Sequence, residues 1–189
     1  MTMALRYFIE LGEKHVLAQV WAPVKNKGRY VLTTSGQLFV LDLKCTGLHQ
    51  YKMASLMYSF SVDGETNGVL GLPARVFRQK LPEWTPNVQY YSDKEYQQLN
   101  HALSYDVHGT LALLVFEPSG QSCVGVLELI LTSQKINYAP RLIKSARHLR
   151  FFAGGKFEKF KHIGFSEYAG KQDGGNLGKG MDMEMNIRN

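Results

Sequence analysis

Two apolar runs, at residues 110–116 and 123–131, dominate the hydrophobic pattern of this chain. Each run is too short for a buried helix and rich in branched residues, and the segment between them contains Pro118 and Gly120. This pattern predicts a β-hairpin with a longer loop. Along the second run both alternating faces are mostly apolar, so we expect the hairpin to lie in the middle of a sheet that is covered on each side.

A second hairpin is predicted early in the chain, with residues 23–28 as a polar turn between its strands. If Trp21 pairs with Tyr30, then Gln19 lies opposite Leu32. In that register the four side chains share one face of the hairpin. An indole, a phenol and an amide on one face form a surface that is apolar in its body and carries hydrogen-bond donors at its tips.

The spacing of apolar residues predicts helices for most of the remaining chain. Ser92 and Glu95 have the spacing of a capping box, which starts a helix. The buried face of that helix would include Tyr96 and Leu103. Residues 48–61 fit either a helix or an extended segment. Further helices are predicted for residues 2–14, residues 71–80 and the segment that follows Pro140.

These elements predict an α/β protein of the α+β type, in which a central antiparallel sheet is flanked by helices. A chain of 189 residues with 44% hydrophobic residues can build one sizeable core. We expect residues 1–152 to form that domain. Residues 153–189 are rich in glycine and polar residues and have no apolar period, so we expect a largely disordered basic tail.

The net charge of +6 belongs mostly to the C-terminal part of the chain. Residues 1–140 carry 12 Lys and Arg against 11 Asp and Glu, whereas residues 141–189 carry 10 against 5. The domain therefore lacks the basic stripe of a nucleic-acid-binding protein, and we expect no direct nucleic-acid binding. No apolar run approaches the length of a membrane span, and the N-terminus lacks a signal-peptide pattern. We expect no membrane association, and a location in the nucleus and cytoplasm.

The residues that carry chemistry form no catalytic or metal-binding constellation along the sequence. Cys45 and Cys123 do not have metal-ligand spacing, and we expect buried free thiols. His101 and His108 stand apart from other ligand types. No Ser/His/Asp set or phosphate-binding loop is present. The chain is therefore expected to have no catalytic residues, no metal and no cofactor.

Four sequence segments resemble the GAF-like region of the plant NIN-like proteins, which are nitrate-responsive transcription factors. The resemblance extends over roughly residues 3–140 and implies a GAF-like fold. In the family this region precedes an RWP-RK DNA-binding domain and an interaction domain, so we expect a chain truncated before both. The residues after Pro140 do not resemble the family, as in a truncated gene or a frame shift. The segments are LAQVWAPV at 17–24, YVLTTSG at 30–36, LPEWTPNVQYY at 81–91 and PSGQSCVGVLEL at 118–129.

The same resemblance implies a nitrate site on the first hairpin. Trp21 and Leu32 match pocket residues of the family directly, and Tyr30 stands where some members have a histidine. Tyr58 is the best match to a more distant pocket tyrosine. Nitrate is planar and delocalised, so it can lie against an aromatic ring while its oxygens accept hydrogen bonds from indole N–H and phenol O–H groups.

Three further residues are candidates to support that site. A buried anion without a nearby cation is costly, so Arg75 or Arg78 would supply positive charge, and Gln19 would supply an amide. Each candidate also has a plain structural interpretation. The aromatic residues of the hairpin can simply pack in the core, and the two arginines can form salt bridges with Glu83 or Glu128.

The resemblance favours a nitrate-sensing regulatory domain that acts in nitrate-responsive transcription. The alternative is a ligand-free dimerisation or docking module, which would form a homodimer or pair with full-length family members. Some GAF domains are methionine sulfoxide reductases that use several cysteines. Only Cys45 and Cys123 are present here, so we expect no enzymatic activity.

Overall fold

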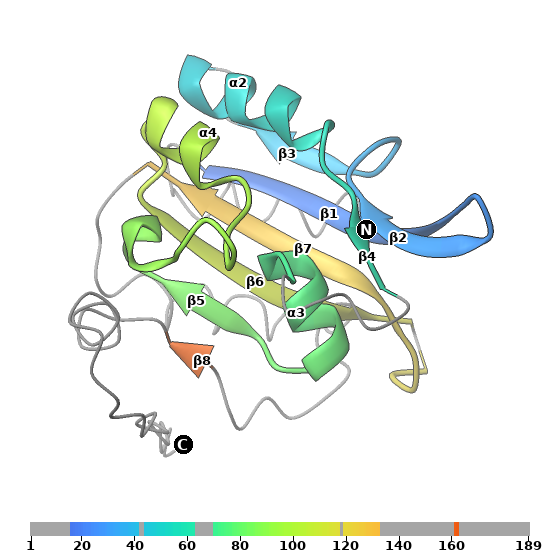
Figure 1. Ribbon diagram of the computed structural model, residues 1–189. Coiled ribbons are helices and arrows are strands. Elements are labelled where there is room, and N and C mark those ends of the chain that lie inside the picture. The colour runs from blue at the N-terminus through green and yellow to red at the C-terminus, as the bar shows by residue number, and fades with distance from the viewer. Residues whose placement is uncertain (1–15, 42–43, 63–69, 118, 133–160, 163–189) are drawn as a thin grey trace.

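The computed structural model describes residues 16–41, 44–62, 70–117, 119–132 and 161–162 (Figure 1). The predicted helices at 2–14 and after Pro140, and the predicted tail apart from residues 161–162, lie outside this part of the chain. The strands are β1 (Val16–Asn26), β2 (Arg29–Thr33), β3 (Phe39–Leu41), β4 (Phe60–Ser61), β5 (Glu83–Thr85), β6 (Gly109–Phe116), β7 (Cys123–Leu131) and β8 (Lys161–His162). The helices are α2 (Thr46–Ser55), α3 (Leu72–Gln79) and α4 (Leu99–Ser104), with a 3-10 turn at Val88–Tyr90.

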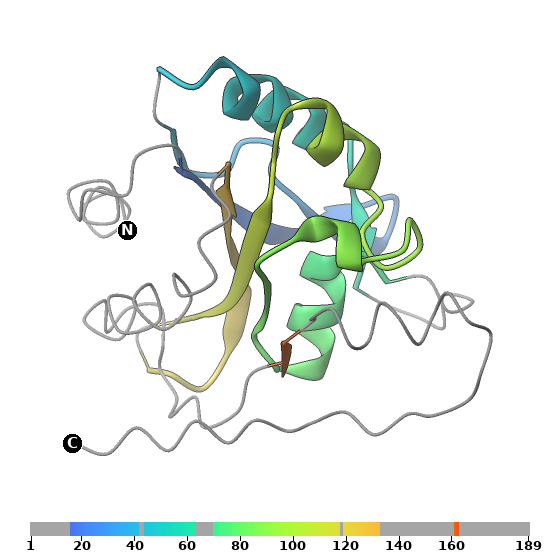
Figure 2. The same cartoon turned by 90° about the vertical axis from the view of Figure 1, so that its left-hand side faces the viewer.

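The described strands form one sheet in the order β4-β2-β1-β7-β6-β5-β8, and β3 pairs with β1 beside β2. The pairs are antiparallel except for β5 with β8. Helices α2, α3 and α4 lie on one face of this sheet (Figure 2). The predicted fold class, α+β with a central antiparallel sheet and flanking helices, is confirmed.

The predicted central hairpin is confirmed as β6 and β7, which lie between β1 and β5. Both faces of this hairpin are buried. One face contributes Leu114, Val126 and Ile130 to the core beneath the described helices. The other face contributes residues such as Leu127 and Leu129 to a second apolar cluster. A strand that is apolar on both sides is stable only when both faces are covered, which is why this hairpin takes the middle of the sheet.

The predicted register of the first hairpin is wrong. Strand β1 continues through the expected turn to Asn26, and the connection is the two-residue turn Lys27-Gly28, in which both residues have positive φ (47° and 84°). Such turns match the right-handed twist of the strands they join. Tyr30 therefore pairs with Lys25 instead of Trp21. The partner of Tyr30 moves by four residues along β1. Tyr30 therefore stays on the same face of the sheet as Trp21 but has a different cross-strand neighbour.

The predicted helices are confirmed in part. Helix α3 matches the prediction for residues 71–80, and the ambiguous segment at 48–61 contains most of α2, followed by β4. The predicted helix from Ser92 is wrong. The backbone N–H of Ser92 donates to Oε2 of Glu95 at 3.0 Å, as in a capping box, but the contact closes only a turn. Helix α4 begins later, at Leu99. Leu103 is 45% exposed instead of buried.

Candidate functional site

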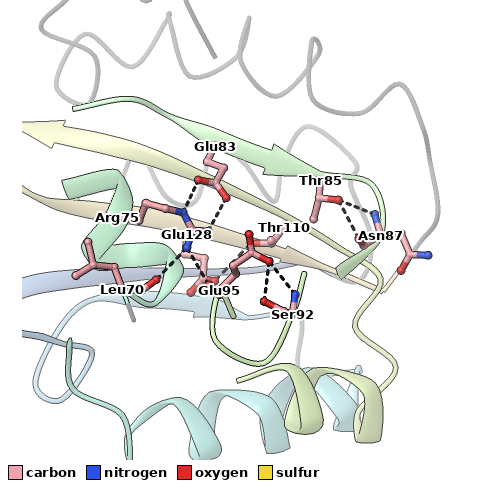
Figure 3. Close-up of polar contacts among 9 residues, drawn as sticks. All are labelled: Leu70, Arg75, Glu83, Thr85, Asn87, Ser92, Glu95, Thr110 and Glu128. Carbon is pink, nitrogen blue, oxygen red and sulfur yellow. Dashed lines mark hydrogen bonds and ion pairs between the residues drawn. The ribbon is translucent and has the colours of Figure 1, made fainter. Parts of the chain in front are cut away.

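A buried carboxylate, Glu128 on β7, is the centre of a polar cluster between the sheet and α2. Its Oε2 atom accepts hydrogen bonds from Nε1 of Trp21 at 2.7 Å and from Nε2 of Gln19 at 3.0 Å. Its Oε1 atom accepts from Oγ1 of Thr110 at 3.4 Å (Figure 3). Glu128 and these three partners are fully buried. The result is an acidic group held in the core by neutral donors.

The strand register brings these donors to Glu128. Gln19 lies directly opposite Glu128 across the β1–β7 pairing, and Trp21 is the next residue on the same face of β1. On the other side, Ala112 of β6 lies opposite Glu128, and Thr110 is two residues away on the same face. Opposite and diagonal neighbours on one sheet face are within reach of one another's side chains. Three adjacent strands therefore build the site.

Lys52 adds positive charge to the cluster from α2. Its side chain is buried, and its Nζ atom has no hydrogen-bond partner among the described residues. Nζ lies 5.0 Å from the ring centroid of Phe39. Burial lowers the pKa of Lys52 to about 8, although the charge of Glu128 opposes this shift. Burial likewise raises the pKa of Glu128, and its hydrogen bonds and Lys52 offset that rise only in part.

The cluster continues from the sheet into the helical layer. Nε2 of Gln19 also donates to Oγ of Ser55 at 3.2 Å, and Nε2 of Gln98 donates to the same oxygen at 3.2 Å. The hydroxyl of Tyr51 donates to Gln98 and shares a short hydrogen bond with the hydroxyl of Tyr96. Burial raises the pKa of Tyr51 well above its usual value, so this hydroxyl stays protonated. The network ties β1 to α2 and to the segment before α4.

The structure brings some of the predicted ligand residues together and separates others. Trp21 and Leu32 are both fully buried in one apolar cluster, and the Trp21 ring packs on Phe60 with centroids 5.1 Å apart. Tyr58 is half-buried, and its ring stacks on the same Phe60 ring with centroids 6.3 Å apart. Tyr30 is 47% exposed near the turn of the hairpin. The predicted pairing of Trp21 with Tyr30 is therefore wrong, because the observed register places the phenol opposite Lys25, four residues from Trp21 along β1.

Of the predicted supporting residues, Gln19 belongs to the Glu128 cluster and Arg75 does not. The Arg75 guanidinium pairs with both carboxylate oxygens of Glu83, at 2.8 and 2.6 Å, and donates to the carbonyl oxygens of Leu70 and Glu95 (Figure 3). The predicted salt bridge between Arg75 and Glu83 is confirmed. Burial opposes the charge of Arg75, but Glu83 outweighs it and raises its pKa. Arg78 is exposed near the end of α3.

A hollow of about 170 Å³ lies beside the contact between Trp21 and Phe60. Phe60 lines the hollow and also packs on Trp21, so one ring separates the hollow from the indole. Polar and apolar groups contribute to the wall. The lining residues are Ser59, Phe60, Ser61, Leu70, Gly71, Ala74 and Gln97.

Sequence reasoning missed Lys52 and Thr110 and treated Glu128 only as a salt-bridge partner. A usable signal was present, because Glu128 is the one charged residue in the apolar run that forms β7. A charge in a strand buried on both faces needs partners. The partners could not be identified from spacing, since Trp21 and Gln19 are 107 and 109 residues away.

The part of the chain that the structure describes contains no metal-binding group and no membrane-spanning helix. No group of His, Cys, Asp and Glu side chains there could hold a metal ion. None of the helices there combines the length and apolar character of a membrane span. Cys45 and Cys123 are free thiols, as predicted, but each is half-buried instead of buried.

Comparisons with known proteins place the sequence among plant relatives. The chain is 70% identical over 150 residues to Protein NLP6 of Arabidopsis thaliana, 66% identical over 149 residues to Protein NLP7 of the same plant, and 64% identical over 149 residues to Protein NLP3 of Oryza sativa subsp. japonica. Each match covers 79% of this chain but only 16–18% of the relative. No protein-family profile matches the sequence.

Among solved structures, the GAF domain region of a protein from Geobacter sulfurreducens PCA is similar to this chain. The TM-score is 0.49 at 13% sequence identity, over 77% of this chain and 85% of that one. At this level the similarity adds no inference to the strand order described above.

Proposed function

We propose, from the premise that this chain is homologous to one region of the NIN-like proteins, that it is a regulatory domain that senses nitrate. The ligand comes from the family resemblance in the hairpin sequence around Trp21. The chain spans about a sixth of its relatives, so the proposal concerns one region of such a protein. That region would regulate transcription in the nucleus and catalyse no reaction itself.

One observation carries the proposal at the level of chemistry. Side chains in the core already hold a carboxyl group, because Trp21 and Gln19 donate to an oxygen of Glu128 in a fully buried environment. Neutral N–H and O–H donors shielded from water bind anionic oxygens more strongly than the same groups do at the surface. This supports an oxyanion as the ligand, and nitrate is the oxyanion that the family resemblance implies.

The size of nitrate limits its affinity. With four heavy atoms and at most about −1.5 kcal/mol from each, the binding free energy cannot exceed about −6 kcal/mol in magnitude. This corresponds to a dissociation constant in the tens of micromolar at best. The domain would therefore respond to nitrate concentrations in the micromolar to millimolar range.

Isothermal titration of the full chain with nitrate tests the proposal, with chloride as the control anion. We expect saturable heat with nitrate and none with chloride. Trp21→Phe keeps an aromatic ring but removes the N–H, so we expect nitrate binding to weaken about tenfold. Trp84→Phe is the matched control at the other tryptophan, in β5, and should leave binding unchanged. The absence of saturable nitrate heat below a few millimolar would end the proposal.

The alternative, a dimerisation module, is favoured by an exposed apolar surface on the helical layer. We name it the α2 patch. Met53, Leu56 and Met57 lie on one side of α2 and the turn after it, and Met57 is 71% exposed. Leu103 of α4 is also exposed, and α4 contacts α2. Large exposed apolar patches commonly mark interaction sites.

A further inference from the structure

The Glu128 cluster resembles an anion-binding site in which the carboxylate of Glu128 takes the place of a bound anion. One indole N–H, one amide N–H and one hydroxyl point at the carboxylate, at 2.7, 3.0 and 3.4 Å. A carboxylate and nitrate are both flat, delocalised and able only to accept hydrogen bonds. The donors that hold Glu128 are therefore suited to hold a small planar oxyanion in its place.

We propose that Glu128 is an internal competitor for the oxyanion site of this domain. A small planar oxyanion binds the donors of Trp21, Gln19 and Thr110 when the Glu128 carboxylate releases them. This inference rests on the proposed function for the identity of the ligand as nitrate. It adds the residue that controls access to the site and sets the affinity.

Two buried atoms in the cluster are left without hydrogen-bond partners among the described residues. These are Nζ of Lys52 and Oε1 of Gln19. Lys52 is 4% exposed, so its ammonium group has donors in the core that Glu128 does not use. A site completed by Glu128 alone would leave no such donors. The Oε1 atom of Gln19 is an acceptor and offers nothing to an anion, so the unused donors of Lys52 are the groups that could bind further acceptor oxygens.

Charge explains why the two anions compete. The groups that face Glu128 are Gln19 and Trp21 from β1, Thr110 from β6, and Tyr51 and Lys52 from α2. Lys52 is the single cation in this set, and it balances one anion. An added nitrate beside an ionised carboxylate would leave a net negative charge in the core, which is costly. Nitrate with a neutral Glu128 side chain keeps the balance.

Nitrate titration of Glu128→Gln tests the inference, because glutamine has nearly the same shape and no charge. We expect the dissociation constant of this variant to be about tenfold lower than that of the unmodified chain. Glu117→Gln, in the loop after β6, makes the same change in net charge and is the matched control. It should change the constant by less than about twofold. Below the pKa of Lys52, about 8, lower pH should tighten nitrate binding more in the unmodified chain than in Glu128→Gln.

A second variant separates this inference from the proposed function. Glu128→Ala removes the internal carboxylate, and we expect formate and nitrate, but not chloride, to raise its melting temperature. Nitrate binding by the unmodified chain that Glu128→Gln does not tighten would overturn the inference and leave nitrate sensing intact. Rescue of Glu128→Ala by formate, with no nitrate binding by the unmodified chain, would support the oxyanion site and reject nitrate sensing. If Glu128→Ala does not fold, the titration of Glu128→Gln decides.

Discussion

At the scale of single residues, the chain places two ionisable groups where neither is well solvated. Glu128 is fully buried and Lys52 is nearly so, and each has a pKa shifted toward its neutral form. Opposite charges stabilise each other there, but a large part of the desolvation cost remains. A core built only for stability would use apolar residues at both positions. Their presence is the reason to assign this cluster a role in binding.

The raised pKa of Glu128 predicts how stability changes with pH. A carboxyl that holds its proton more tightly in the folded chain than in the unfolded chain stabilises the fold fully below about pH 4.5, its ordinary pKa. This stabilisation is lost as the pH rises through the folded pKa. We therefore expect the unmodified chain to lose stability relative to Glu128→Gln between about pH 4.5 and 7, by about 1.4 kcal/mol for each unit of pKa difference.

Urea unfolding at a series of pH values measures this difference. The measurement is confined to pH values below 7, because Lys52, whose pKa is about 8, stays charged over that range. Glu117→Gln is a control of opposite sign. Hydrogen bonds from Ser119 and Ser122 lower the pKa of Glu117, so its contribution is present above the ordinary pKa and is lost as the pH falls. A flat profile for Glu128→Gln relative to the unmodified chain would contradict the raised pKa.

At the scale of elements, the bidentate pair of Arg75 and Glu83 joins α3 to β5. Arg75 also donates to the carbonyl oxygens of Leu70 and Glu95, so one side chain connects four segments of the chain. Both partners are buried, with side-chain exposures of 10% and 1%. A buried pair of this kind holds the positions of its elements more than it adds net stability. This geometry explains why Arg75 is not available as the cation of the Glu128 cluster.

Arg75→Ala is expected to lower the free energy of unfolding by about 3–5 kcal/mol, because Glu83 stays buried without its cation. Chemical denaturation measures this loss. Arg78→Ala on the same helix is the matched control, and an exposed position should change stability by no more than about 0.5 kcal/mol. Similar losses in the two variants would show that the pair is not the connection between α3 and β5.

At the scale of the whole molecule, the α2 patch is, within the part of the chain that the structure describes, the surface that we assign to contact with a second copy of the chain. Helix α2 has no acidic residue in its first turn, and its cation Lys52 is buried. Two such surfaces can therefore approach each other without strong charge repulsion. Standard protein interfaces bury about 800 Å² per partner, so a dimer would also involve neighbouring surface such as Phe39 of β3, which is 49% exposed.

Sedimentation over a range of concentrations tests this dimer. We expect self-association of the full chain that Met57→Glu abolishes, because a charge at the most exposed member of the patch cannot be buried. Val124→Glu places the same charge on another exposed apolar residue, in β7, and should leave association unchanged. A chain that remains monomeric at all concentrations would reject the dimerisation module. Nitrate should not move the equilibrium if dimerisation alone is the function.

The sequence by itself determined the features that depend on local pattern. The central β6–β7 hairpin followed from two runs that are apolar on both faces, and α3 followed from a short helical period after Gly71. The family resemblance was likewise carried by contiguous segments. Such features need no knowledge of distant contacts, because side-chain alternation and helical spacing are properties of neighbouring residues.

Only the tertiary structure decided the features that depend on long-range pairing. The first hairpin turns at the two residues Lys27-Gly28 instead of over the predicted residues 23–28. This shorter turn sets the register and places Tyr30 opposite Lys25, away from Trp21 along the strand. Two of the donors to Glu128, Trp21 and Gln19, are more than 100 residues away from it in sequence. A pattern shows that a buried charge needs partners. Which partners it receives is fixed by how the strands align, and that alignment is a property of the folded sheet.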